Sequence, residues 1–256
     1  MHKLIKAFEK NSLPNNMLLD IYGISTQKHY DCVFVAPSWT PDKIFDTSKI
    51  NVEQIFTGRF ANTYHIKNHS KNYLFITLQI GAPNIIDFCL LCYKVKCDNF
   101  VFIGSVGALV PEIKVGDVIV PEYSISGNGA TLYLHEKLDK TNIFEPIYST
   151  SELNKQIIKT CKKHKIKALN VPVISMDSVM SEYLHLDEFR AMGAKAIEME
   201  CATFFGCMSI INKKSSALLV VSDNSATGEH LIGRTEEDKK HYHRVRKQIG
   251  KILLEI

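Results

Sequence analysis

The most informative part of the chain is Ala196-Ile197-Glu198-Met199-Glu200-Cys201-Ala202, followed by the apolar run Ala217–Val221 and then Ser222-Asp223-Asn224. It places three carboxylates at the ends of two successive apolar elements. Carboxylates are seldom fully buried without a partner, and in such positions they serve chemistry more often than packing. This part of the sequence therefore predicts core elements whose ends carry functional residues.

Apolar strands and helical segments alternate outward from this stretch. Strands are predicted at residues 32–36, 60–66, 73–80, 99–103, 116–121, 169–175, 194–199 and 216–222, and helices at 85–96, 149–163, 181–192, 200–212 and from 235 onward. The alternation predicts an α/β fold, a single domain with a central mixed, mainly parallel sheet flanked by helices on both faces. Sites in such folds lie at the carboxyl ends of the strands.

Two polar clusters have the spacing of helix N-caps. They are Ser149-Thr150-Ser151-Glu152, ahead of the helix that ends near Lys163, and Thr235-Glu236-Glu237-Asp238, ahead of the C-terminal helix. The C-terminal helix also carries the densest basic stretch, residues 239–247. Its apolar residues recur at helical spacing, so the basic stretch is interpreted as a solvated helix face.

Composition argues against nucleic-acid and membrane partners. The chain has 256 residues, 45% of them hydrophobic, and its net charge of +4 comes from lysines spread along the sequence. Its apolar runs are far shorter than the roughly 20 residues of a membrane span. The first residues lack the apolar block of a secretory signal, so a cytoplasmic location is expected.

The cysteines are expected to be reduced core residues. Seven are scattered from Cys32 to Cys207, mostly within apolar runs. Cys89 and Cys92 have Cys-x-x-Cys spacing, but their surroundings are typical of the buried face of a helix. Because no second Cys or His pair stands at zinc-site spacing, we expect neither a metal site nor a cofactor.

Three short motifs are predicted to converge on one edge of the sheet, because each follows an apolar strand: Gly104-Ser105-Val106-Gly107, Glu198-Met199-Glu200 and Ser222-Asp223. Backbone N–H groups and a hydroxyl at Gly104–Gly107 would suit a sugar hydroxyl or an anion. The alternative at this position is a tight turn.

The acids allow two interpretations each. Glu198 and Glu200 lie two residues apart, hence on the same side of an extended strand end, where one carboxylate could accept hydrogen bonds from both hydroxyls of a ribose. The alternative is a pair of acids at a helix N-terminus. Asp223 is either a general acid whose pKa is raised by burial or the N-cap of a following turn.

The motifs together resemble the nucleoside phosphorylase and nucleosidase superfamily over residues 30–255. The resemblance is carried by Gly104-Ser105-Val106-Gly107-Ala108, Val115-Gly116-Asp117-Val118, Ala196-Ile197-Glu198-Met199-Glu200 and Val221-Ser222-Asp223. It implies cleavage of an N-glycosidic bond. It also implies a nucleoside phosphorylase-like catalytic domain at residues 30–256, behind an N-terminal lead-in at residues 1–29.

The resemblance also implies roles for individual residues. Glu200 would hold the ribose diol, Met199 would pack under the sugar, and Asp223 would protonate purine N7. Ser105 would face the anomeric carbon, as the third catalytic residue. The remaining substrate contacts would come from Gly104, Val106, Gly107, Val179, Glu198, Ser222 and Arg59, with Val106, Gly107 and Val179 against the base.

The chain departs from the family at the phosphate-binding positions. Relatives carry arginines after the first strand and before Gly-Ser-x-Gly, but this chain has Ala36-Pro37-Ser38-Trp39 and Phe102-Ile103 there. A bidentate phosphate clamp depends on arginine geometry. We therefore predict hydrolysis of a purine nucleoside or nucleotide, with closest similarity to short AMP nucleosidase-like members. Arg59, Arg234 or a neighbouring subunit's lysine would meet a 5′-phosphate.

Two alternatives remain open at this point. One is phosphorolysis with a rebuilt phosphate site that uses Lys43, Ser105 and Arg59. The other is a nucleoside-binding protein without catalysis. The resemblance further implies a homo-oligomer, as a dimer, trimer or hexamer, because relatives complete each site with residues from a neighbouring subunit.

Overall fold

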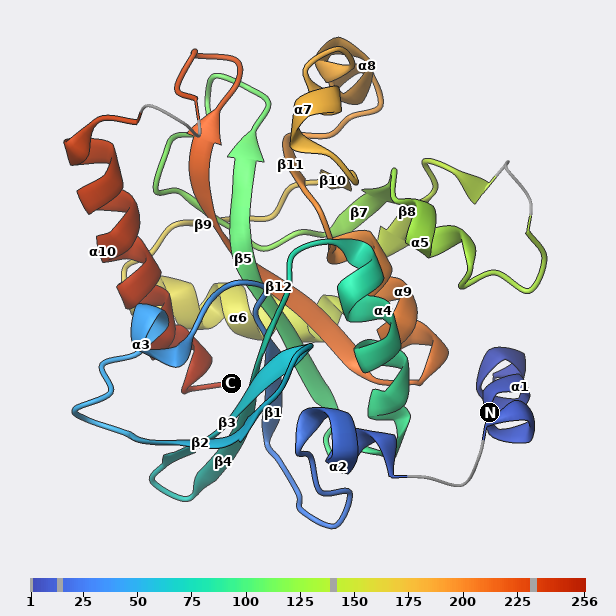
Figure 1. Cartoon of the computed structure of the whole chain (residues 1–256). Coiled ribbons are helices and arrows are strands. Elements are labelled where there is room, and N and C mark those ends of the chain that lie inside the picture. The colour runs from blue at the N-terminus through green and yellow to red at the C-terminus, as the bar shows by residue number, and fades with distance from the viewer. Residues whose placement is uncertain (1, 13–15, 139–141, 231–233) are drawn as a thin grey trace.

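The computed structural model describes residues 2–12, 16–138, 142–230 and 234–256 (Figure 1). Twelve strands within these ranges form one sheet in the order β2-β3-β4-β1-β5-β11-β10-β7-β8; β12 pairs with β5 and β6, and β6 also pairs with β9. The strands are β1 Cys32–Val35, β2 Asn51–Thr57, β3 Ala61–Asn68, β4 Lys71–Leu78, β5 Asn99–Ala108, β6 Val118–Ile119, β7 Tyr123–Ser126, β8 Pro146–Tyr148, β9 Ala168–Leu169, β10 Val173–Ser175, β11 Ala196–Glu198 and β12 Lys214–Asn224.

Helices cover both faces of this sheet. They are α1 Lys3–Asn11, α2 Met17–Tyr22, α3 Pro41–Ile44, α4 Ala82–Leu91, the 3₁₀ helix η1 Cys92–Lys94, α5 Gly129–Leu132, α6 Ser151–Lys163, α7 Val179–Glu182, α8 Leu186–Ala191, α9 Cys201–Ile210 and α10 Glu236–Leu253. In Figure 1, α4 and α9 lie on one side of the central strands, and α10 and α3 lie on the other.

Alternating side chains of the central strands feed two separate cores. Phe100 and Phe102 of β5 join the cluster under α4 and α9, whereas Val101 and Ile103 join the cluster under α3, α6 and α10. This is the two-residue period of a strand that is buried on both faces. β1 runs parallel to β4 and β5, and β12 runs parallel to β5, whereas β2, β3 and β4 are antiparallel. The predicted fold class is confirmed.

Several predicted elements differ from the structure for local reasons. The strand predicted at residues 169–175 is divided into β9 and β10, because Pro172 between them has no N–H to donate to a ladder. The helix predicted at 181–192 is divided into α7 and α8. Strands β2, β7 and β8 were not predicted. β2 is a largely exposed strand whose apolar residues Val52, Ile55 and Phe56 do not alternate with polar ones, so its sequence lacks the period of a half-buried strand.

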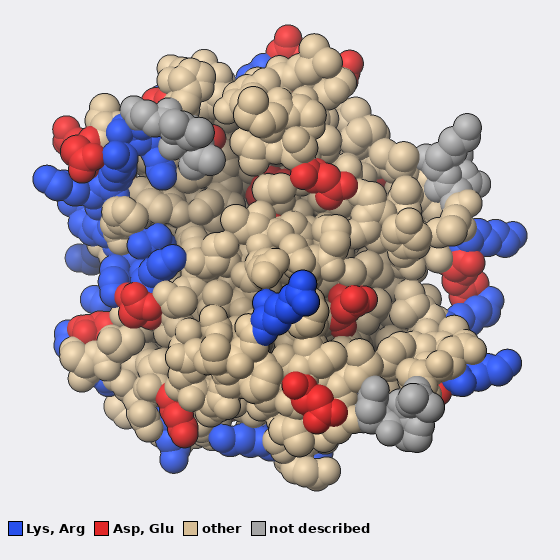
Figure 2. Space-filling view, in the orientation of Figure 1, with Lys and Arg blue, Asp and Glu red and all other residues tan. Residues whose placement is uncertain are grey.

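One of the two predicted helix caps is confirmed. Thr235 is the N-cap of α10, and its side chain accepts a hydrogen bond from Asp238 N at 3.1 Å. Thr150 precedes α6 without capping it, because its Oγ1 accepts from Ser215 N at 2.9 Å instead. In Figure 2, Lys and Arg gather along the edge of the molecule where α10 lies in Figure 1, as expected for a solvated helix face.

Helix α2 and the cysteines contribute to the interior, whereas α1 buries only Ile5. Leu18 and Tyr22 of α2 are buried in the same cluster as α4 and α9. All seven cysteines are buried and free, and burial raises the pKa of the Cys89 and Cys92 thiols, which lie on the inner face of α4 and η1. Within the described ranges, no helix has the length and apolar character needed to cross a membrane.

Candidate active site

A division in the sheet beside β5 creates the candidate site. β1 pairs with β5 as far as Phe102, and β11 pairs with the same edge of β5 only from Gly107 onward. Residues 103–106 therefore have no strand partner on this edge in the described part of the chain. β12 supports the opposite edge of β5 throughout. The strand order thus switches at β5, which is where α/β sheets bind ligands.

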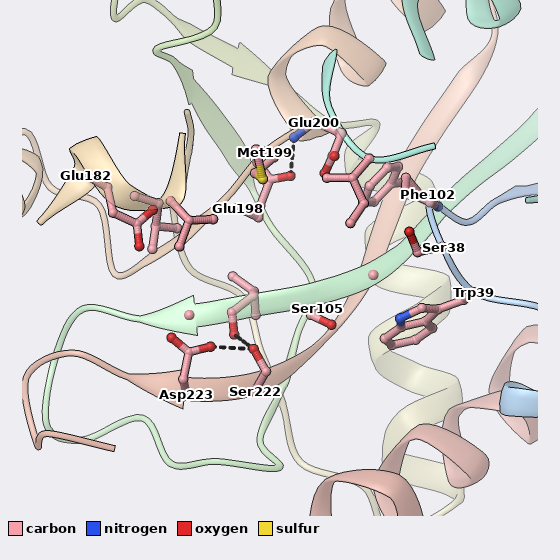
Figure 3. Close-up of a pocket in the computed structure, with 17 residues that line it drawn as sticks. Ser38, Trp39, Phe102, Ser105, Glu182, Glu198, Met199, Glu200, Ser222 and Asp223 are labelled. Carbon is pink, nitrogen blue, oxygen red and sulfur yellow. Dashed lines mark hydrogen bonds between the residues drawn. The ribbon is translucent and has the colours of Figure 1, made fainter. Parts of the chain in front are cut away.

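A pocket with a cavity volume of about 240 Å³ lies at this division. It is lined by Pro37, Ser38, Trp39, Ile80, Phe102, Gly104, Ser105, Val106, Gly107, Val179, Glu182, Ile197, Glu198, Met199, Glu200, Ser222 and Asp223 (Figure 3). All the catalytic and substrate-binding residues predicted from the sequence are among them except Arg59, and the other candidates for a phosphate, Lys43 and Arg234, are also absent from the lining. Arg59 is exposed, and its guanidinium packs over the ring of Phe60, 5.7 Å from the ring centroid.

The motif Gly104–Gly107 is not a turn after a strand. It lies within β5, which continues to Ala108, so the alternative of a tight turn is wrong. Its residues are held by the register Leu219↔Gly104 through Asp223↔Gly107 with β12. The pocket therefore meets a rigid strand at this motif rather than a loop.

Glu198 and Glu200 have different surroundings, although both line the pocket. Glu198 ends β11, and its carboxylate accepts a hydrogen bond from Glu200 N at 2.7 Å (Figure 3). It also accepts hydrogen bonds from Cys201 N at 2.8 Å and from the Ser175 hydroxyl. These donors include the first N–H groups of α9, so Glu198 stabilises the helix N-terminus. The expectation that both acids share one side of an extended strand is wrong, because the chain begins α9 directly after Glu200.

Glu200 directs its carboxylate toward the turn before α4. Its Oε1 accepts a hydrogen bond from Gly81 N at 2.5 Å. Gly81 has φ +104°, a conformation that strongly favours glycine. Burial raises the pKa of Glu200, and the negative charge of Glu198 raises it further, while the Gly81 N–H opposes both effects. The buried carboxylate of Glu200 can therefore accept further hydrogen bonds from the donors of a ligand.

Asp223 enters the pocket from a β-bulge in β12. The register with β5 shifts between Val221 and Asp223, and such bulges redirect side chains next to sites. The Ser222 hydroxyl donates to Asp223 Oδ1 at 2.5 Å. Burial raises the pKa of Asp223, although the Ser222 hydroxyl and the charge of Arg234 oppose the shift. The alternative that Asp223 caps a following turn is wrong, because Asp223 lies inside the strand.

The pocket wall at Ser105 is backed by an aromatic and cationic cluster, made of Tyr242 and Arg246 from α10 together with Arg234 and Trp39 from outside this helix. Ser105 Oγ and the Tyr242 hydroxyl share a hydrogen bond of 2.6 Å. The guanidinium groups of Arg234 and Arg246 lie 5.1 and 5.6 Å from the centroid of the Tyr242 ring. Arg246 also packs over Trp39, at 5.3 Å. The Nε atoms of both arginines are buried without a hydrogen-bond partner among the described residues.

Glu182 is a pocket residue that was not predicted. It ends α7, the short helix that also supplies Val179. Burial raises the pKa of Glu182 to about 7, and the charge of Asp223 contributes to the shift. The signal in the sequence was weak, because Glu182 lies in the helix predicted at residues 181–192 and not directly after an apolar strand. In the described ranges, no group of three or more His, Cys, Asp or Glu side chains is placed to hold a metal ion.

Comparisons with known proteins identify the family. The sequence model of the phosphorylase superfamily matches residues 42–256, so the chain belongs to this family. A DeoD-type purine nucleoside phosphorylase of Bacillus velezensis is 25% identical over 165 residues, which cover 63% of this chain and 68% of the relative. The protein of that name from Mycoplasma genitalium is 23% identical over 194 residues, 75% of this chain and 79% of the relative. The predicted resemblance is confirmed, and so is the prediction that the chain is an enzyme.

Proposed function

We propose that this enzyme cleaves the N-glycosidic bond of a purine nucleoside or nucleotide, with water as the attacking group. The products are the free base and ribose or ribose 5-phosphate. The names of the relatives, purine nucleoside phosphorylases, support this substrate class. The observation that carries the proposal is the placement of two raised-pKa acids, Glu200 and Asp223, in one pocket beside β5.

Asp223 supplies the proton in this proposal. Because burial raises its pKa, the carboxyl keeps a proton closer to neutral pH than an exposed aspartate would. It donates this proton to N7 as the bond between C1′ and the base breaks. The base then leaves as a neutral molecule, and general acid catalysis of this kind contributes about 10² to 10⁴ in rate.

Glu200 holds and stabilises the sugar. Two ribose hydroxyls donate to its carboxylate, and together with the Gly81 N–H they favour its ionised form over the neutral form that burial favours in the empty pocket. The ionised carboxylate stabilises the positive charge that develops on the ribose ring in the transition state. We propose that Met199 packs under the sugar, that Val106, Gly107 and Val179 contact the base, and that Ser105 faces the anomeric carbon.

Hydrolysis is proposed because no Lys or Arg is among the residues that line the described pocket. The test is incubation of the purified protein with adenosine, inosine, AMP and methylthioadenosine in phosphate-free buffer, with chromatography of the released base. We expect free base from at least one substrate and none from the same substrate with Glu200→Ala. Absence of free base from all four substrates in phosphate-free buffer would overturn hydrolysis, and absence with phosphate as well would overturn cleavage of these nucleosides altogether.

Phosphorolysis is a second candidate, favoured by Arg234 and Arg246. These arginines stand behind Ser105 and have no carboxylate within 4 Å among the described residues, so a small movement of Tyr242 would offer two guanidinium groups to a phosphate. Under this candidate, turnover requires inorganic phosphate, and Arg246→Met raises the KM for phosphate at least tenfold. Lys43, proposed earlier for this role, instead donates to the Ser38 carbonyl at 3.0 Å and does not line the pocket.

A homo-oligomer and a cytoplasmic location remain proposals. Four residues next to the pocket on and after α7 are exposed and apolar: Val179, Met180, Tyr183 and Leu184. Met180 and Leu184 are 82% and 83% exposed, as expected for side chains that a second subunit covers. Analytical ultracentrifugation of the wild type and of Leu184→Lys tests this, since a variant of unchanged mass would count against an interface at α7.

A further inference from the structure

Glu182 and Asp223 bring two carboxyl groups to the same end of the pocket. In Figure 3 both lie on the side away from Glu200, Ser38 and Trp39, Glu182 on α7 and Asp223 on β12. Both residues line the pocket, and the charge of Asp223 contributes to the raised pKa of Glu182. The part of the pocket that receives the base in the proposed function is thus bounded by two acids, not one.

Glu182 has no partner in the protein that explains its position. The described residues give its carboxylate no hydrogen bond or ion pair, and the groups that shift its pKa include no cation and no donor. A half-buried carboxylate without a donor is unfavourable, because it has lost water without gaining a hydrogen bond. A ligand that brings a donor to this end of the pocket would remove that cost.

Just below pH 7 the two acids together hold one proton, because burial and the charge of Asp223 raise the pKa of Glu182 to about 7. An acceptor such as N7 beside Asp223 favours that proton on Asp223, which then donates, while the ionised Glu182 only accepts. Adenine presents N7, an acceptor, directly beside its 6-amino group, a donor, whereas a 6-oxopurine presents two acceptors at the same places. The donor and acceptor pair of the pocket therefore matches the edge of a 6-aminopurine and opposes that of a 6-oxopurine.

We infer that Glu182 is a specificity-determining residue, which accepts a hydrogen bond from the exocyclic amino group next to N7, so that the pocket selects 6-aminopurine nucleosides. This inference rests on the proposed function, because that function places the base between Asp223 and Val179. Loss of the acceptor changes the preference between bases rather than the cleavage step, since Glu182 does not touch the glycosidic bond.

The test compares the wild type with Glu182→Gln at pH 6.5, just below the pKa of about 7 of Glu182, where the pair of acids holds one proton. The substrates are adenosine, inosine and purine riboside, which has no 6-substituent. We expect Glu182→Gln to lower the ratio of kcat/KM for adenosine over inosine by about tenfold or more, because the glutamine amide can donate to O6. The value for purine riboside stays within about threefold of the wild type. The control is Glu188→Gln, which changes an exposed glutamate of α8 that contacts His185.

A second measurement keeps the inference separate from catalysis. Calorimetric titration with free adenine and free hypoxanthine measures base preference whether or not the protein turns over a nucleoside. We expect the wild type to bind adenine at least tenfold more tightly, and Glu182→Gln to lose this preference. Equal affinities in the wild type, or a preference that Glu182→Gln leaves intact, would overturn the role of Glu182. Failure of nucleoside cleavage alone would overturn only the proposed function.

Discussion

Gly107 and Asp223 are partners in the register between β5 and β12, and a β-carbon placed on Gly107 would lie 2.9 Å from Oδ2 of Asp223. That separation is below the contact distance of real β-carbons. The absence of a side chain at residue 107 therefore leaves the space that the Asp223 carboxyl group occupies. The second glycine of Gly104-Ser105-Val106-Gly107 thus acts on the acid through the neighbouring strand.

Replacement of Gly107 by alanine tests this relationship. The methyl group would displace the end of the Asp223 side chain, which can rotate away without moving the backbone. We expect kcat to fall at least tenfold, since misplacement of a catalytic group by about 1 Å can cost about 10² in rate, while Tm changes by less than about 3 °C. Gly129→Ala is the control, because its β-carbon would stand 3.5 Å from the nearest atom, an ordinary contact. Equal activity of the two variants would contradict this account.

Two substrates with different leaving groups can distinguish a role of Asp223 as an acid from a structural role. Asp223→Asn removes the proton donor, so kcat/KM for adenosine should fall by about 10² to 10⁴. A p-nitrophenyl riboside leaves as a stable anion and needs no proton, so its cleavage should fall by less than about tenfold. Steady-state kinetics with the two substrates provides the measurement. Parallel losses with both would mean that Asp223 does not act as the acid.

Glu198 and Glu200 are two residues apart but are predicted to respond differently to substitution. Glu198→Ala leaves the N–H groups of Glu200 and Cys201 without their acceptor, and we expect a loss of about 3 kcal/mol in the free energy of unfolding. Glu200→Gln should lower kcat/KM by about 10² or more with little change in stability. Urea unfolding measures the free energy of unfolding of both variants, and nucleoside cleavage measures their kcat/KM. A stable Glu198→Ala variant would show that the carboxylate does not hold α9 in place.

The raised pKa of Glu182 predicts that the free energy of unfolding depends on pH. Folding raises its pKa from 4.5 to about 7, so the folded protein holds a proton that the unfolded chain has lost between these values. Stability from this group is therefore fully present at low pH and is lost as pH rises from about 4.5 to about 7. Glu182→Gln removes the cost of the charge, which we place at about 1 kcal/mol because the group is only partly buried, so Tm should rise by about 3 °C at pH 8 and remain unchanged at pH 4.5. A Tm difference that is the same at both pH values would exclude this explanation.

The sequence predicted those parts of the site that follow buried strands. Glu200 and Asp223 come after apolar runs, and apolar runs are the strongest signal of a central strand. The strand period could not predict that Glu198 turns to the helix N-terminus, because this depends on where α9 begins. The bulge before Asp223 and the extension of β5 through Gly107 were likewise missed, since both are set by pairing between distant segments.

Residues outside strands were harder to place. Glu182 reaches the pocket through the short helix α7, whose position follows from the path of the chain after β10. Arg59 was expected at the site on the basis of its charge alone, but the exposed turn between β2 and β3 keeps it away from the lining. Tyr242 and Arg246 approach Ser105 because α10 packs across β12 and α3, and Arg234 lies just before this helix. This tertiary arrangement has no local signal in the sequence.

The rate of adenine release from adenosine, measured in parallel without phosphate and with 10 mM phosphate (about ten times a typical upper KM), tests the central claim most directly. Hydrolysis through Glu200 and Asp223 predicts the same kcat/KM in both buffers, with ribose as the only sugar product. Release that occurs only with phosphate and yields ribose 1-phosphate would contradict hydrolysis and assign phosphate binding to the arginines behind Ser105.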